Sequence, residues 1–211
     1  MDEQLTLYSI RRVEFAPSFG ETLQVRDPGT DEVLAVAVER PGFFVHLLAL
    51  ILGLLAGSQS DRQIDDLLPN KIVVTTGNDP KTGGPLFRIQ RRVSPFRPKM
   101  VIRDGKGTTM WTFKGKNNGW GYEFRALGAG GQEVGGLSYD FRELASKCRH
   151  YGLEVGSVVR PALASDRKNG LDIRLGGPGT VPSSDGIAAE RNVFLLAAGF
   201  TVYMLEKGPA D

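Results

Sequence analysis

Cysteine and histidine are scarce in this chain of 211 residues, which holds one cysteine and two histidines. The lone Cys148 excludes a disulfide within the chain and fits a reducing compartment. No spacing such as C-x-x-C or H-E-x-x-H occurs, so the sequence predicts no metal site and no cofactor. The N-terminal residues also lack the basic segment and apolar run of a secretory signal, and we expect a cytoplasmic location.

The same scarcity leaves little material for catalysis. Cys148 and His150 lie two residues apart, a spacing at which side chains share a face on a strand but not on a helix. Such a pair activates a thiolate when the base is itself oriented by a third group. No third group can be identified from spacing, so we expect a protein that is not an enzyme.

Long hydrophobic runs are missing as well. The most apolar stretch, residues 43–57, stops short of the ~20 residues that a membrane-spanning helix needs. A helix of this length is most often buried, with contact at a membrane interface second and a true anchor last. All three interpretations stay open on the sequence alone. A short turn is expected over residues 60–67.

The second apolar run, residues 192–205, follows Glu190-Arg191 and predicts a helix over residues 188–205. Its residues are apolar on all sides, and a helix without a polar face is either buried completely or placed in lipid. A closed sheet wrapped around the helix would bury it completely. That arrangement predicts a group of buried side chains: Phe194, Leu195, Ala198, Val202 and Leu205.

Glycine is abundant, at 27 residues, and it marks turns within a repeated pattern. Residues 7–13, LYSIRRV, return as residues 86–93, LFRIQRRV. In each copy a gap containing Pro and Phe leads to a strand, a turn with Asp and Gly, and a returning strand. Asp-Gly between alternating apolar runs is typical of a β-hairpin, because both residues tolerate positive φ. The strands expected next are 23–26 and 33–38 in the first copy, and 100–103 and 110–113 in the second.

Weaker copies of the pattern predict a third hairpin from strands 122–127 and 133–137, and later strands at 151–159 and 171–175. Residues 140–149 are expected to form a short helix. Two clear copies are too few for a solenoid, which needs at least ~3 repeats. We therefore predict one mainly β domain over residues 1–211, in which a closed antiparallel barrel of two related halves wraps around the hydrophobic C-terminal helix.

Three features give the chain a likeness to a known family. The first is the segment from Asp61-Arg62 through Leu67-Leu68-Pro69, which leads to a strand and then to Pro85–Ile89. The second is the repeated hairpin at Val25/Asp27, at Ile102/Asp104 and, loosely, at Leu127/Gly131. The third is Glu190-Arg191 immediately before the apolar helix. With these features the chain resembles the tubby C-terminal-like superfamily, which includes phospholipid scramblases and LURP-one-related proteins. The resemblance implies an antiparallel barrel around a C-terminal helix. Members of the superfamily are phosphoinositide binders, proposed lipid scramblases, or proteins of unknown role. The multi-cysteine stretch and acidic calcium-binding segment of animal scramblases have no counterpart, so calcium-dependent scrambling is not expected.

Charge is nearly balanced overall, at +2, but cations crowd residues 88–116, where Asp104 is the only acid. Strand alternation puts Arg88 and Arg92 on one face of their strand. Antiparallel pairing with the next strand would gather them with Lys99 and Arg103 into a patch. The candidate site for an anionic lipid consists of Arg88, Arg92, Arg97, Lys99, Arg103 and Lys106.

Clustered cations beside a membrane contribute ~1 kcal/mol each against an anionic surface, so this patch favours anionic phospholipid or phosphoinositide as its ligand. An ordinary solvated sheet face explains the same residues equally well. Nucleic acid is an unlikely partner, because the near-neutral total charge supplies little phosphate neutralisation. We expect a binding module, cytoplasmic or peripheral to the membrane. The alternative is a protein-interaction or scaffold domain without lipid binding, with a protein partner contacting the apolar helix at 43–57.

Overall fold

A computed structural model describes residues 6–13, 21–39, 71–92, 97–140, 142, 145–159, 173–176 and 186–206. The predicted helix at 43–57 and turn at 60–67 lie outside the described residues. The described residues form twelve strands and one helix, α3 (Glu190–Glu206). The strands are β1 (Thr6–Val13), β2 (Thr22–Arg26), β3 (Val33–Glu39), β4 (Lys71–Thr76), β5 (Pro85–Arg92), β6 (Lys99–Asp104), β7 (Thr109–Asn117), β8 (Gly121–Gly128), β9 (Glu133–Asp140), β10 (Ala145–His150), β11 (Leu153–Val159) and β12 (Ile173–Gly176).

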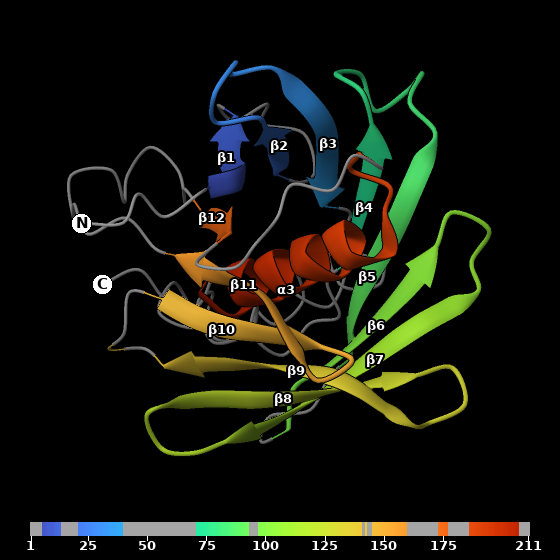
Figure 1. The fold of residues 1–211 in the computed structure, drawn as a ribbon. Coiled ribbons are helices and arrows are strands. Elements are labelled where there is room, and N and C mark those ends of the chain that lie inside the picture. Colours follow the sequence, from blue (N-terminus) through green and yellow to red (C-terminus); the bar gives the residue numbers. More distant parts are fainter. Residues whose placement is uncertain are drawn as a thin grey trace, which may run out of the picture.

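The strands close into one antiparallel barrel around α3 (Figure 1). Neighbours in the barrel are neighbours in the chain from β1 to β12, and β1 also pairs with β12 to complete the ring. Side chains alternate across the wall. Along β7, Trp111 and Phe113 are buried inside, whereas Lys114 and Lys116 are exposed outside. The predicted mainly β fold with a closed antiparallel barrel is confirmed.

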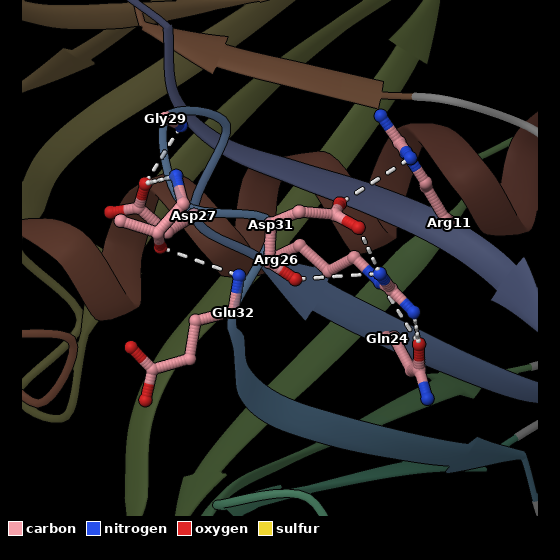
Figure 2. Close-up of polar contacts among 8 residues, drawn as sticks. Arg11, Gln24, Arg26, Asp27, Gly29, Asp31 and Glu32 are labelled. Carbon is pink, nitrogen blue, oxygen red and sulfur yellow. Dashed lines mark hydrogen bonds and ion pairs between the residues drawn. The ribbon is translucent and has the colours of Figure 1, made fainter.

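The repeat in the sequence returns as a repeat of hairpin turns. Between β2 and β3 the Asp27 carboxylate accepts a hydrogen bond from the backbone N–H of Gly29 (2.8 Å), which folds the turn back on itself (Figure 2). Asp31 adopts the left-handed conformation here, at φ 57°, which short polar side chains tolerate. Its carboxylate pairs with Arg26 (2.6 Å) and Arg11 (3.5 Å) of the adjoining strands (Figure 2).

The second copy uses the same device between β6 and β7. The Asp104 carboxylate accepts a hydrogen bond from the backbone N–H of Thr108 (2.8 Å), and Gly107 donates to the Asp104 carbonyl (3.0 Å). In the third hairpin, between β8 and β9, Gly131 donates to the carbonyl of Gly128 (2.9 Å), so glycine stands where the first two copies have aspartate. The first two turns therefore share a carboxylate that accepts backbone hydrogen bonds, and the third keeps only the backbone hydrogen bond.

Helix α3 runs through the barrel as the centre of its core (Figure 1). Residues 192–204 are all buried, Phe194 and Phe200 completely. Phe200 packs edge-on against Phe87 of β5, with ring centroids 6.2 Å apart. Because the sheet surrounds the helix, apolar residues on every side of it find partners, and the predicted buried helix is confirmed. Of the side chains predicted to be buried, Leu205 is only partly so, since it lies near the end of the helix.

Polar contacts tie both ends of α3 to the wall. At its C-terminal end the Arg91 guanidinium, on the inner face of β5, donates to the Met204 carbonyl (3.2 Å). A cation suits the free carbonyls and negative dipole end of a helix. The Tyr203 hydroxyl donates to the Glu21 carboxylate in the same region. At the other end the Asn192 amide donates to a loop carbonyl four residues before the helix (2.7 Å).

The short helix predicted over residues 140–149 is wrong. Residues up to Asp140 belong to β9, and β10 begins at Ala145. Within β10, Ser146, Cys148 and His150 are buried while the residues between them are exposed, which is a period of two and not of 3.6. The segment is a strand because β9 and β11 pair with it on both sides.

Candidate functional site

Cationic side chains form a row across the outer face of the barrel, one from each of four successive strands. Arg92 of β5 lies opposite Lys99 of β6, and Lys99 lies opposite Lys114 of β7. Lys114 in turn lies opposite Arg125 of β8. Directly opposed residues of neighbouring strands have Cβ atoms ~5 Å apart, so these charges lie close together. The four residues are termed the basic row.

A hollow of about 460 Å³ opens on the same face, between β6, β7 and β8. Its lining contains one carboxylate, Glu123, and five cationic side chains: Arg97, Lys99, Lys114, Lys116 and Arg125. These six residues, with Pro98 and Gly115, are termed the basic hollow. Its volume falls within the ~300–1,000 Å³ of sites that hold small ligands.

Gly115 brings the segment before β6 against β7. The backbone N–H of Gly115 donates to the Pro98 carbonyl (2.7 Å). A Cβ at this position would lie 2.7 Å from both Pro98 Cγ and the Phe124 ring, closer than real side chains pack. Glycine therefore permits the approach that places Arg97 in the lining with Lys99.

The charges of the basic hollow are not balanced by ion pairs. Among the described residues, no side chain of its five cations forms an ion pair or hydrogen bond. Glu123 lies opposite Lys116 in the register but makes no ion pair with it in the described part of the chain. Like charges directly opposite on a sheet destabilise it, by up to ~1 kcal/mol per pair. An anion bound in the hollow would relieve this repulsion.

The structure brings together some of the predicted site residues. Arg88 lies opposite Arg103, and Arg92 lies opposite Lys99, all on the outer face that the strand pairing predicted. On the outer face, one further pair of opposed residues (a rung), both uncharged, lies between these two pairs. Arg88 and Arg103 therefore lie outside the lining of the hollow. The predicted patch is thus two cationic rungs, of which one joins the basic row.

The remaining two predicted site residues lie at opposite ends of β6. Arg97 precedes β6 and lines the basic hollow. Lys106 lies on the turn after β6, exposed, and is not part of the lining. Arg97 comes before β6 and Lys106 comes after it, so the length of the strand separates the two side chains.

Sequence reasoning missed Lys114, Lys116 and Arg125 as members of the site. Alternation with the buried Trp111 and Phe113 indicates that Lys114 and Lys116 face outwards, and this signal was present in the sequence. The rung that each cation occupies depends on register, which alternation does not reveal.

Cys148 and His150 lie together on the inner face of β10 and are both buried. Burial, with the charge of Glu154 as a lesser cause, raises the pKa of the Cys148 thiol to about 12. Burial lowers the pKa of His150, and the nearby Glu190 carboxylate offsets part of this effect. The His150 ring stacks on Phe194, with centroids 4.2 Å apart. At neutral pH the thiol is protonated, so this pair supplies no thiolate nucleophile.

Metal ligands and membrane-spanning segments were sought in the same described residues. They contain no group of three or more His, Cys, Asp or Glu side chains arranged to hold a metal ion. No helix within them has the length and apolar character needed to cross a membrane.

In comparisons with protein-family models, curated proteins and solved structures, nothing matched this chain.

Proposed function

We propose that the chain is a non-enzymatic binding module that contacts anionic phospholipid, phosphatidylserine or phosphoinositide, at a membrane surface through the basic hollow. The observation that carries the proposal is the convergence of five cations and a single carboxylate on one hollow of about 460 Å³, with no ion pair to these cations among the described residues. A phosphorylated headgroup would supply the missing negative charge and would accept hydrogen bonds from lysine and arginine donors at once.

The charge of the hollow sets the strength of such docking. Five cations and one carboxylate leave a net charge of +4. At ~1 kcal/mol per cation near an anionic membrane, the electrostatic part reaches about 4 kcal/mol, which corresponds to a Kd of about 1 mM. Binding of this kind is reversible and weakens with salt, since the Debye length is only ~8–10 Å at physiological ionic strength.

Membership of the tubby C-terminal-like superfamily is part of the same proposal. A closed barrel around a buried C-terminal helix is the architecture that the resemblance implies, and Glu190 begins that helix here. This agreement supports the assignment, and with it a location at the cytoplasmic face of a membrane. Calcium-dependent scrambling is not included in the proposal.

The alternative is a protein-interaction or scaffold domain that does not bind lipid. Two exposed side chains on and after the β10–β11 turn favour it, Tyr151 (64% exposed) and Leu153 (72% exposed). The partner surface expected at residues 43–57 lies outside the described residues. Two side chains offer a smaller contact than the basic hollow, so lipid binding is the better supported function.

Sedimentation with vesicles tests the proposal. The protein is mixed with phosphatidylcholine vesicles that are plain, or contain phosphatidylserine or a phosphoinositide, at low and at physiological salt. We expect binding to the anionic vesicles that decreases with salt, and little binding to the neutral ones. The two anionic preparations at equal surface charge distinguish a general charge preference from recognition of a phosphorylated inositol.

Charge-reversed variants locate the site. Lys114→Glu with Arg125→Glu changes two cations of the basic hollow, and we expect it to abolish binding. Lys81→Glu with Lys106→Glu makes the same change in net charge at two exposed turn residues outside the hollow, and we expect binding to persist. Equal loss in both variants would show that binding follows net charge alone. Absence of binding by the unmodified protein would favour the protein-interaction alternative.

A further inference from the structure

The turn between β7 and β8 presents one large apolar side chain to solvent. Trp120 is 60% exposed, in contrast to Trp111, which is 3% exposed in the core. The turn stands away from the barrel body at the lower left of Figure 1. Trp120 and Tyr151 are the two large aromatics exposed among the described residues, and Trp120 is the one on the hairpin that carries the basic hollow.

Hydrogen bonds within the turn define the backbone conformation that presents Trp120. The Asn117 side chain accepts a hydrogen bond from the Gly119 N–H (2.7 Å), and the Asn118 side chain accepts one from the Trp120 N–H (3.1 Å). Gly119 has φ 90°, in the left-handed region that glycine tolerates. Asn118 and Gly121 also share a backbone hydrogen bond (3.1 Å) that closes the turn.

A guanidinium covers one face of the exposed indole. The Arg142 Cζ lies 4.3 Å from the centroid of the Trp120 ring, a cation–π contact. Arg142 is itself held by Asp140, through Nη2 to Oδ2 (3.0 Å) and Nε to Oδ1 (3.2 Å). The hydrogen bonds from Arg142 keep the pKa of the Asp140 carboxyl below its usual value, so the pair stays charged. The result is an apolar ring beside a fixed cation.

The tip of this hairpin adjoins the basic hollow. The Lys116–Glu123 rung belongs to the hollow, and one further rung, Asn117–Tyr122, leads to the turn that carries Trp120. With ~3.4 Å per residue along a strand, the turn begins ~7 Å beyond the last rung of the hollow. The hairpin of β7 and β8 therefore carries both the cations of the hollow and, at its tip, Trp120.

We propose that Trp120 inserts into the headgroup region of an anionic bilayer while the basic hollow binds the headgroups. This inference rests on the proposed function and adds the orientation of the protein on the membrane. Tryptophan prefers the interface between water and hydrocarbon, because its ring is apolar and its N–H is polar. Electrostatic docking of millimolar strength does not hold a protein on a membrane, and stable attachment takes two signals. Trp120 supplies the second.

Tryptophan fluorescence with brominated phospholipids tests the insertion, because bromine on the acyl chain quenches only an indole that reaches the bilayer. We expect vesicles containing phosphatidylserine to shift the emission to shorter wavelength and brominated chains to quench it. In Trp120→Phe only the buried Trp111 remains, and neither change should occur. Emission from Trp111 in that variant also reports that the barrel is folded.

Binding affinity supplies a second measurement with a matched control. Burying part of an indole ring contributes enough apolar area that Trp120→Ala should weaken vesicle binding by at least about tenfold. Leu153→Ala removes an exposed side chain near the β10–β11 turn, which the antiparallel strand order places at the opposite end of the wall. We expect that control to bind within about twofold of the unmodified protein, as surface substitutions usually do.

The outcomes separate this inference from the proposed function. Normal vesicle binding without quenching, or with full affinity in Trp120→Ala, overturns the insertion and leaves lipid binding by the hollow intact. Quenching that persists in Lys114→Glu/Arg125→Glu supports insertion and contradicts the hollow as the lipid site. Absence of any binding by the unmodified protein overturns both.

Discussion

Truncation of Phe194 to alanine is the perturbation that bears most directly on a barrel built around a helix. Phe194 is completely buried on α3. Its ring meets Trp111 at 5.2 Å and Phe113 at 5.3 Å between centroids, and it stacks on His150 at 4.2 Å. The three partners come from β7 and β10, so one side chain joins the helix to well-separated parts of the wall.

The expected loss follows from this environment. Replacing a buried phenylalanine by alanine costs about 3–5 kcal/mol, because transfer free energy is lost and a cavity remains. The aromatic partners add about 0.5–1.5 kcal/mol per contact beyond area alone, which places Phe194→Ala near the upper part of that range. Natural domains are stable by only about 5–15 kcal/mol, so this loss removes a large share of the free energy of unfolding.

Urea unfolding followed by tryptophan fluorescence measures the loss, because Trp111 packs on Phe194 and reports the core. With an m-value of about 2 kcal/mol/M, the midpoint should fall by roughly 2 M. The melting temperature should fall by roughly 6–20 °C. Leu153→Ala, on the surface, should change the free energy of unfolding by less than about 0.5 kcal/mol. A loss below about 1 kcal/mol in Phe194→Ala would refute the packing of α3 against this aromatic cluster.

Two further predictions concern the buried titratable groups of β10. Because burial holds the pKa of His150 below its ordinary 6.5, the unfolded chain binds more protons as the pH falls below 6.5, and stability should decrease from there through the folded pKa. Urea midpoints at pH 7.5 and 5.5 should differ more in the unmodified protein than in His150→Gln, and equal differences would contradict this reasoning. Because the pKa of Cys148 is raised from 9.0 to about 12, the folded thiol should react with iodoacetamide at pH 8 about a thousandfold more slowly than the thiol of the urea-unfolded chain. Rapid alkylation of the folded protein would contradict this burial of Cys148. The same shift predicts that the free energy of unfolding falls as the pH rises from 9 towards 12, because the folded thiol then keeps a proton that the unfolded thiol has lost.

Patterns with a strong period could be predicted from the sequence. The apolar run of α3 has no polar face, so complete burial is its only arrangement in water, and a closed sheet is the means of burying it. The hairpin turns were visible because Asp27 and Asp104 each stand where a carboxylate can accept backbone hydrogen bonds within a tight turn. These signals are local in the chain.

The strand β10 shows where local signals fail. Its residues carry few of the large apolar side chains that mark a strand, since Ser146, Cys148 and His150 form its buried face. Polar and small residues are compatible with both helix and strand over a short range, which is why the sequence predicts a helix over residues 140–149. Pairing with β9 and β11 decides the conformation, and the partners lie in separate segments of the chain.

The candidate site divides in the same way. Alternation in the sequence determined which cations face outwards from each strand, and therefore the existence of a basic face. Register across four strands decided that Arg92, Lys99, Lys114 and Arg125 share one row, and it left Arg88 and Arg103 four residues along their strands from that row. A period of two specifies a face but not a rung, so the row, the basic hollow and its distance from Trp120 exist only once the barrel has closed.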